Sequence, residues 1–298
     1  MNIKNIMTGA AIGVLAASGA AHADVTLNAL FMAQAAYSED DIRNMTAEFE
    51  AANPGIKVNA ELVPYEALHD KIVLSQSANG YDVVLYDVIW PAEFAQYQLL
   101  EDVTSRIDDK TRSGILDGAW TTVEYDGALY GMPWIADTKF LFYNKDMLKA
   151  AGFDNPPATW EELRAQAAAI KEKGIVDYPL VWSWSQSEAA ICDYTTILSG
   201  MGGEFLDADG KPAFNTGGGL KALEYMVGTL DDGLTNPNSR EYLEEDVRRV
   251  FSSGQAAFAL NWGYMYNLAN DPAESQVAGK VGIAPAPGTD DVSKASAV

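Results

Sequence analysis

Two carboxylates and several tryptophans are the residues of this chain best placed for chemistry. Residues 81–90 contain a short apolar run that ends at Asp87 and is followed by Trp90. A run of this kind predicts a strand buried on both faces. In open α/β sheets, ligands bind just beyond the carboxyl ends of such strands. A hydrogen-bond acceptor and a flat aromatic face at that position suit a polyhydroxylated ligand.

Each of these residues also has a structural interpretation. Asp87 could cap the strand end or form a surface salt bridge, although its place after a buried strand favours ligand contact. Trp90 could equally cover the hydrophobic core. Trp182 and Trp184 are spaced i, i+2, so they would share one face of a strand, and one of them could belong to the core.

The sequence offers little for metal binding or nucleophilic catalysis. Cys192 is the single cysteine, and the chain has two histidines, whereas zinc sites need several such ligands. There is no G-x-S-x-G elbow and no glycine-rich phosphate loop. Residues 207–210 faintly resemble a calcium loop, but Phe205 stands where its first aspartate belongs, so a hairpin turn is the better interpretation. We expect no catalytic residue, no metal and no cofactor.

Composition and charge exclude several kinds of partner. The 298 residues are 48% hydrophobic and carry a formal net charge of −22. So acidic a surface argues against nucleic acid and anionic membranes. Lys4, the apolar segment 6–17 and Ala21-His22-Ala23 predict a secretory signal peptide over residues 1–23. No later segment could span a membrane, so we expect export without direct membrane insertion.

The first part of the chain after residue 23 alternates strand and helix patterns. Strands are predicted at 25–31, 56–62 and 82–86, giving a βαβαβ unit and hence a doubly wound, largely parallel sheet. Ser38 with Asp41 marks the start of the first helix, and Pro64 opens the second. The residues expected to face inward from these helices are Ile42, Met45, Phe49, Leu68, Ile72 and Val73.

The character of the chain changes near Pro133. An extended aromatic segment at 134–143 is followed by Thr159, which opens an alanine-rich helix with a capping box. Trp160 in that helix is expected to pack rather than to bind. Strands are predicted at 180–184, 256–262 and 281–285, and helices at 220–230 and 242–251.

Several short segments form an ordered series over most of the chain. They are residues 49–58 (FEAANPGIKV), 82–94, 131–133 with 142–146 (GMP and FYNKD), 159–163 (TWEEL), 251–257 with 261–262 (FSSGQAA and NW) and 285–288 (PAPG). Together they resemble the extracellular solute-binding proteins of ABC importers, in the family that includes the maltose-binding and other sugar-binding proteins.

This resemblance implies an α/β, two-lobe, type II periplasmic-binding-protein fold with ligand held in an interlobe cleft. The implied lobes are 24–132 completed by 264–298, and 133–263. Family members usually continue for roughly a hundred residues beyond the position of Val298, a length comparable to a typical domain. The resemblance therefore implies that the sequence is C-terminally truncated and that the second lobe is incomplete.

The resemblance also extends the set of candidate ligand-binding residues. Asp137 stands where the family often places a sugar-binding carboxylate, and Trp262 matches its stacking aromatic. Gln34 and Tyr37 follow the first strand, where the family's first ligand loop lies. The full set expected to contact ligand is Gln34, Tyr37, Asp87, Trp90, Asp137, Trp182, Trp184 and Trp262.

The function implied is a monomeric periplasmic carrier that captures a sugar or sugar alcohol, closes around it and delivers it to ABC transporter permease subunits. One alternative keeps the fold and changes the ligand to an oxyanion, a cation or another small polar molecule. An alternative of another class is a secreted glycosidase, since Asp87 and Asp137 could in principle act as its carboxylate pair.

Overall fold

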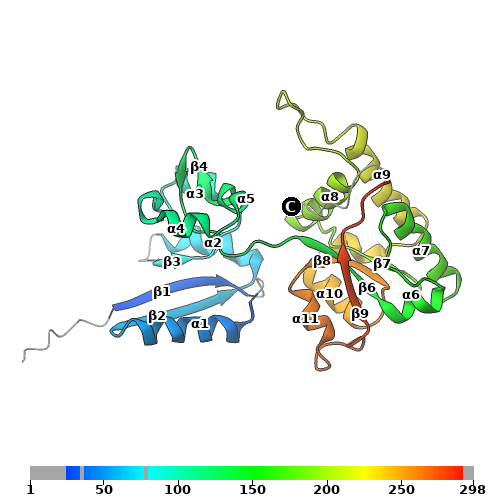
Figure 1. The fold of residues 1–298 in the computed structure, drawn as a ribbon, viewed down its shortest axis with the longest axis horizontal. Coiled ribbons are helices and arrows are strands. Elements are labelled where there is room, and N and C mark those ends of the chain that lie inside the picture. Colours follow the sequence, from blue (N-terminus) through cyan, green and yellow to red (C-terminus); the bar gives the residue numbers. More distant parts are fainter. Residues whose placement is uncertain (1–24, 34–36, 77–79, 291–298) are drawn as a thin grey trace, which may run out of the picture. The chain divides into compact units, whose positions relative to one another are not determined.

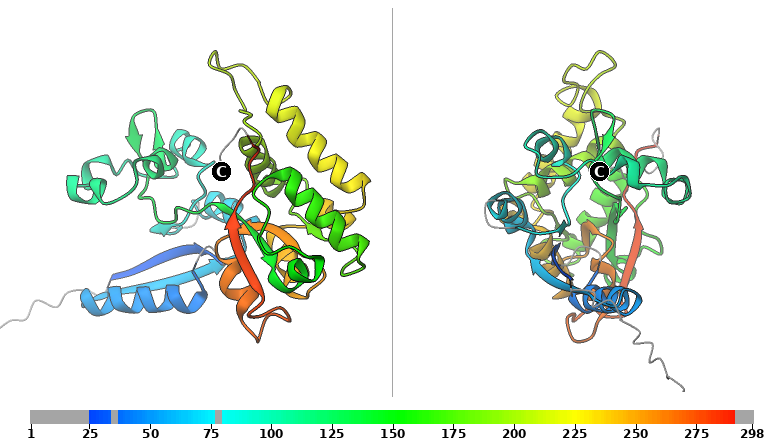
Figure 2. Two further views of the ribbon diagram at one scale, coloured as in Figure 1. Left: turned by 45° about the vertical axis from the view of Figure 1, so that its right-hand side comes forward. Right: turned by 90° about the vertical axis from the view of Figure 1, so that its left-hand side faces the viewer.

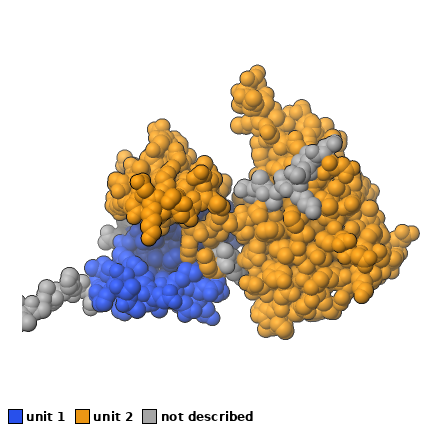
Figure 3. Space-filling model, in the orientation of Figure 1, with its two compact units in different colours: residues 1–33, 38–87 blue, residues 34–37, 88–298 orange. Residues whose placement is uncertain are grey.

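The computed structural model describes residues 25–33, 37–76 and 80–290. The chain forms two compact units (Figure 1 and Figure 3). Unit 1 comprises residues 1–33 and 38–87, and unit 2 comprises 34–37 and 88–298. The predicted signal peptide lies outside the described residues.

Unit 1 is built on a parallel sheet, as predicted. Its elements are β1 (Val25–Met32), α1 (Glu39–Ala52), β2 (Ile56–Val63), α2 (Tyr65–Ser75) and β3 (Val83–Val84), with strand order β2-β1-β3. Both neighbours of β1 run parallel to it, which confirms the βαβαβ unit. Helix α1 begins with the expected capping box, because the side chains of Ser38 and Asp41 each accept the other's backbone N–H.

The predicted inward faces of these helices are only partly right. Of the six side chains predicted to face inward, one on α1 and two on α2 are buried. The other three each have more than a third of their surface exposed. The buried residues are Ile42, Leu68 and Ile72, and the exposed ones are Met45, Phe49 and Val73.

The prediction that the 82–86 strand is buried on both faces is wrong. Strand β3 is only two residues long and lies at the edge of the described sheet. Val83 is consequently 52% exposed. An edge strand has a neighbour on one side only, so its side chains are covered less than those of a central strand.

Unit 2 begins with short helices and a hairpin. They are α3 (Pro91–Gln96), η1 (Thr104–Arg106), α4 (Asp109–Ser113), α5 (Asp117–Trp120), η2 (Thr121–Val123), β4 (Glu124–Tyr125) and β5 (Ala128–Leu129). The hairpin turns at Asp126 and Gly127, whose φ angles are 50° and 79°. Asp-Gly suits this turn because both central positions need positive φ.

The main sheet of unit 2 positions the candidate site. Its strands are β6 (Lys139–Asn144), β7 (Leu180–Val181), β8 (Phe258–Trp262) and β9 (Val281–Pro285), in the order β7-β8-β6-β9. Strand β7 is parallel to β8, whereas β6 is antiparallel to both β8 and β9. The carboxyl ends of β8 and β9 therefore lie at the same end of the sheet as the amino end of β6.

Helices cover both faces of this sheet (Figure 1 and Figure 2). Successive residues of a strand point to opposite faces, so Leu141 joins one core and Phe142 the other. The first core contains residues of α6 (Lys145–Ala151), α7 (Trp160–Glu172), α8 (Glu188–Gly200) and α9 (Gly217–Asp231). The second contains residues of α10 (Glu244–Ser252) and α11 (Met265–Asn270).

The expected lobe boundaries stay a prediction, on which the pairing of β9 bears. Residues 264–298 were expected to complete the first lobe, yet β9 pairs with β6 over five positions and α11 packs in the core of the same sheet. Residues 88–132, also expected in the first lobe, fall in unit 2. Strand pairing decides membership of a sheet, and the sequence pattern of 281–285 did not show which strand would be its partner.

Two local expectations about unit 2 are confirmed. Thr159 and Glu162 form the capping box of α7. Trp160 is fully buried and packs edge-on against Tyr225, with ring centroids 5.4 Å apart. Within the described residues, no helix combines the length and apolar character needed to cross a membrane.

Candidate functional site at the end of strand β8

The candidate site of unit 2 lies where β8 ends and β6 begins. Because the strands are antiparallel, Trp262 at the end of β8 pairs with Lys139 at the start of β6. Asp137, two residues before Lys139, is thereby brought to Gly263, which follows Trp262. The fold thus brings together Asp137 and Trp262, two predicted site residues that are distant in sequence.

The Asp137 carboxylate is held by two backbone N–H groups. The N–H of Thr138 donates to Oδ1 at 2.8 Å, and the N–H of Gly263 donates to Oδ2 at 3.2 Å. The side chain is otherwise exposed, and an ionised carboxylate has about four lone-pair sites. Asp137 can therefore accept further hydrogen bonds from a ligand hydroxyl without giving up the bonds that orient it.

Gly263 allows this close approach. A Cβ atom at this position would lie 3.1 Å from Oδ1 of Asp137. The glycine is therefore explained by the carboxylate that its N–H group binds.

The Trp262 indole is half-buried and fixed at two places. Its Nε1–H group donates to Oε1 of Glu244 at 3.4 Å, and the Lys139 ammonium lies over its ring, 5.1 Å from the centroid. Cations are attracted to the face of an indole ring. These contacts set the plane of a ring that still has exposed surface.

Beside Trp262 lies a largely buried polar group, the Lys139 cluster, formed by Lys139, Asp193, Ser183 and the partly exposed Glu244. Nζ of Lys139 is 2.6 Å from Oδ1 of Asp193, 3.2 Å from Oε1 of Glu244 and 3.2 Å from Oγ of Ser183. The side chains of Lys139 and Asp193 have no exposed surface. Asp193 also accepts the backbone N–H of Ser183 at 2.9 Å.

The pKa values of this cluster follow from burial and from the opposed charges. Burial by itself would lower the pKa of Lys139, but the carboxylates of Asp193 and Glu244 outweigh it and raise that pKa. Burial raises the pKa of Asp193, although the Lys139 ammonium opposes this shift. Lys139 therefore stays charged, and its charge is fully engaged inside the protein.

Sequence reasoning missed the Lys139 cluster. A signal was present, because Lys139 opens an apolar run (KFLFY) that was expected to be extended. A lysine at the start of a buried strand needs a carboxylate partner. The partners on α8 and α10 could not be chosen from the pattern, since neither helix is near Lys139 in sequence.

Trp182 and Trp184 lie on the same side of the chain, as their spacing predicts, and form a stacked pair. Their ring centroids are 5.5 Å apart and their planes differ by 2°. Trp182 has no exposed surface, and its Nε1–H group donates to Oγ1 of Thr235 at 3.0 Å. It therefore has no surface with which to contact a ligand. Trp184 is 8% exposed, so Trp182 serves as the support against which Trp184 packs.

Trp90 and Tyr37 pack against other rings of unit 2. Trp90 is 8% exposed, with its centroid 5.7 Å from that of Phe94 on α3, which favours the interpretation that it covers apolar surface. Tyr37 stacks on Trp134, with centroids 5.3 Å apart. Trp134 was not among the predicted site residues, although it opens the aromatic segment after Pro133 and is 38% exposed.

Asp87 and Gln34 complete the predicted set. Asp87 belongs to unit 1, three residues beyond β3, and is half-buried. It does follow the strand end, as predicted, although β3 is shorter than expected. Gln34 lies outside the described residues.

The weak calcium-loop resemblance of residues 207–210 is a turn in the structure. Oδ1 of Asp207 accepts the backbone N–H groups of Asp209 and Lys211, both at 2.9 Å. Gly210 supplies the positive φ, at 74°. In the part of the chain that the structure describes, no three His, Cys, Asp or Glu residues are grouped as metal ligands would be.

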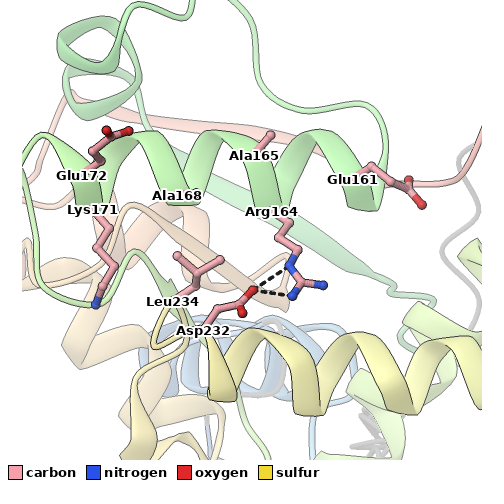
Figure 4. Close-up of a pocket in the computed structure, with 8 residues that line it drawn as sticks. All are labelled: Glu161, Arg164, Ala165, Ala168, Lys171, Glu172, Asp232 and Leu234. Carbon is pink, nitrogen blue, oxygen red and sulfur yellow. Dashed lines mark hydrogen bonds and ion pairs between the residues drawn. The ribbon is translucent and has the colours of Figure 1, made fainter.

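A separate hollow lies between α7 and the C-terminal end of α9 (Figure 4). Arg164 donates from Nε and Nη2 to a single oxygen of Asp232 across it, so its charge is already engaged. None of the predicted site residues that the structure describes lines this hollow, whose wall is formed by Glu161, Arg164, Ala165, Ala168, Lys171, Glu172, Asp232 and Leu234.

Comparison with known proteins agrees with the fold. A family model for bacterial extracellular solute-binding proteins matches residues 23–296. The chain belongs to this family, whose members are non-enzymatic substrate-binding proteins of ABC transporters.

Individual relatives show the extent of the similarity. The chain is 32% identical over 240 residues to a binding protein of Brucella abortus (strain 2308), covering 80% of this chain and 57% of that protein. It thus spans just over half the length of that curated relative. A maltose-bound T. maritima protein, MalE3, superposes with a TM-score of 0.81 at 32% identity, covering 91% of this chain and 70% of the other.

A second solved structure extends the comparison. It is a solute-binding protein from Agrobacterium radiobacter K84 in complex with ribitol, with a TM-score of 0.79 at 27% identity, covering 92% of this chain and 69% of the other. These neighbours have the two-lobe periplasmic-binding-protein fold, so the predicted fold class is confirmed.

Proposed function

We propose that this protein captures a neutral sugar or sugar alcohol and delivers it to the permease subunits of an ABC importer. The observation that carries the proposal is that Asp137 accepts the N–H of Gly263, the residue that follows Trp262 at the end of β8. A sugar presents hydroxyl groups that donate hydrogen bonds and C–H faces that lie flat on aromatic rings. An oriented carboxylate beside a fixed, partly exposed indole meets both requirements.

Each predicted site residue that the structure describes then has a proposed role. Asp137 accepts hydrogen bonds from ligand hydroxyls, and Trp262 stacks on the ring or carbon chain of the ligand. Trp184, Tyr37 with Trp134, and Asp87 are further candidate contacts. Trp90 and Trp182 act by packing, and Trp182 keeps Trp184 in place.

The structure disfavours an anionic ligand. An oxyanion site needs a basic side chain or several free N–H groups at its surface. The basic residue at the strand end, Lys139, is fully buried and engaged by Asp193 and Glu244. The carboxylate of Asp137 would repel an anion, so a cation or a neutral polar molecule is the remaining alternative.

The glycosidase alternative has less support. Family members are non-enzymatic, and the Asp137 side chain is exposed, whereas a general acid of this kind requires burial among apolar groups. The relatives named above bind maltose and ribitol, which agrees with capture rather than hydrolysis. A periplasmic location follows from the predicted signal peptide and from the family.

Isothermal titration calorimetry with maltose, ribitol and a panel of other sugars and polyols tests this proposal. We expect dissociation constants on the order of micromolar for the preferred ligand. Asp137→Asn and Trp262→Ala should each weaken binding by about tenfold or more, from the loss of a charge-assisted hydrogen bond or a stacked ring.

Two matched variants serve as controls. Asp207→Asn alters another exposed carboxylate that accepts two backbone N–H groups. Tyr178→Ala alters another ring under a lysine ammonium, that of Lys171 at 5.2 Å. Neither should change the affinity. Absence of binding to every sugar and polyol in the panel would overturn the ligand assignment.

A further inference from the structure

The Lys139 cluster has a property that packing alone does not explain. It places one ammonium and one carboxylate in the core of unit 2, with a second, partly exposed carboxylate beside them, next to a tryptophan that reaches the surface. Burying an ion pair costs desolvation free energy, and apolar residues of similar volume often stabilise a fold as well or better. The position of the cluster beside Trp262 suggests what it contributes instead.

We propose that Lys139 is a positioning residue, which fixes the indole of Trp262 in the orientation that a sugar or polyol needs. This inference rests on the proposed function of Trp262 as the stacking ring. Lys139 does not touch the ligand, because its side chain is fully buried. It acts through Trp262: its ammonium occupies one face of the indole ring, and the exposed part of the ring stays available to the ligand.

The geometry ties the ring to three separate elements. Oε1 of Glu244 is the shared atom, since it lies 3.2 Å from the Lys139 ammonium and accepts the indole N–H of Trp262 at 3.4 Å. Glu244 is the first residue of α10, and its backbone carbonyl accepts the side-chain amide of Asn261 at 2.9 Å. Asp193 on α8 and Ser183 after β7 then hold the ammonium itself.

This arrangement restricts rotation of the indole about both of its side-chain torsions. The N–H to Glu244 bond fixes the direction of the ring edge, and the cation over the face fixes the plane. Stacking on a sugar requires a flat, correctly inclined ring, so a free indole would lose part of the affinity when it is ordered on binding. Pre-orientation by Lys139 removes that loss.

A neutral variant tests the proposal without leaving an unpaired buried charge. In Lys139→Met/Asp193→Asn/Glu244→Gln the three charges are removed together, while the glutamine retains an acceptor for the Trp262 N–H. A second protein, Lys139→Gln, keeps a hydrogen-bond donor toward Asp193 but no positive charge. Far-UV circular dichroism and thermal unfolding show whether each variant is folded.

The decisive readout is the near-UV circular dichroism of Trp262 alone, which does not require a ligand. It is obtained by subtracting the spectrum of the matching Trp262→Phe protein from that of each variant. We expect this difference band to fall clearly in both folded variants, because the ring is no longer held in one orientation. Lys171→Met, which removes the cation over Tyr178, is the matched control and should leave the band unchanged.

Calorimetry with the preferred sugar supplies the functional readout. The neutral variant should bind several-fold to about tenfold more weakly, because the free indole must then be ordered when the ligand binds. An unchanged Trp262 band in a folded neutral variant, or a reduced band with unchanged affinity, would overturn the positioning role. If the native protein binds no sugar or polyol, the proposed function fails, and the band still decides whether Lys139 orients Trp262.

Discussion

The ammonium of Lys139 lies 5.1 Å from the centre of the Trp262 ring, and the two residues pair directly across strands β6 and β8. This relationship joins the buried charges of unit 2 to the surface on which a ligand is proposed to bind. It also places Asp137, two residues before Lys139, at the backbone of Gly263. One strand register thus positions the carboxylate, the indole and the cation.

Removal of the cation alone should destabilise the protein strongly. Lys139→Ala leaves the buried carboxylate of Asp193 and the partly exposed carboxylate of Glu244 without their ammonium partner, at a cost of about 3–5 kcal/mol in the free energy of unfolding. Urea unfolding followed by circular dichroism measures this loss. Lys171→Ala, at a half-buried lysine whose hydrogen-bond partners are backbone carbonyls, should cost only about 1 kcal/mol. Equal effects of the two substitutions would contradict the assigned role of the buried pair.

Trp182 and Trp262 should differ in what their substitution changes. Trp182→Phe deletes the indole N–H that donates to Thr235 and should cost about 1–3 kcal/mol of stability. Because Trp182 has no exposed surface, ligand affinity should change by no more than about twofold, well under 1 kcal/mol. Thermal unfolding and calorimetry on the same samples separate the effects. A large loss of affinity without a loss of stability would instead restore Trp182 as a direct contact.

Gly263 offers a steric test of the Asp137 site. In Gly263→Ala the new methyl group would lie 3.1 Å from Oδ1 of Asp137, so the carboxylate must shift from its two N–H donors. We expect affinity for the preferred sugar to fall several-fold, which corresponds to about 1 kcal/mol. Gly118→Ala is the matched control, since a Cβ there meets no atom within 4 Å. Calorimetry should show the loss for Gly263→Ala only.

The N-caps of α7 and α8, two consecutive helices of unit 2, should contribute differently to the free energy of unfolding. Thr159 caps α7 through a hydrogen bond to the N–H of Glu162, whereas the Ser187 side chain makes no capping bond to α8. Thr159→Ala should therefore cost about 1 kcal/mol and Ser187→Ala a few tenths at most. Urea midpoints at constant slope report the difference. Matching losses at the two caps would show that the capping bond of Thr159 does not stabilise α7.

Alkaline pH should weaken unit 1 through Tyr86. Burial raises the pKa of the Tyr86 hydroxyl from 10.0 to about 12, so the folded state keeps a proton that the unfolded state releases. The associated stability is complete below pH 10 and is lost as the pH rises from about 10 to 12. Unfolding by urea at pH 8 and pH 11 measures this decline. Tyr86→Phe has no such proton and should show a smaller decline over the same range.

Local sequence signals determined much of the fold because local interactions produce them. The capping boxes at Ser38 and Thr159, the alternation of strand residues and the βαβαβ order all depend on neighbours within a few positions. The end of a strand shortly before Asp87 was also visible in the sequence, whereas the ligand-binding roles of Asp137 and Trp262 stay predictions. The ordered motifs by themselves indicated the family.

Tertiary structure decided everything that depends on partners far apart in the chain. It paired β9 with β6, a partner that the sequence pattern did not indicate. It buried Trp182 against Thr235 and Trp184, and it left Met45 and Phe49 exposed. Above all, it brought Lys139 to Asp193 and Glu244. The sequence places a lysine at the start of an apolar strand, and a buried lysine requires a carboxylate partner. Only the packing of α8 and α10 on the sheet determines which carboxylates reach it.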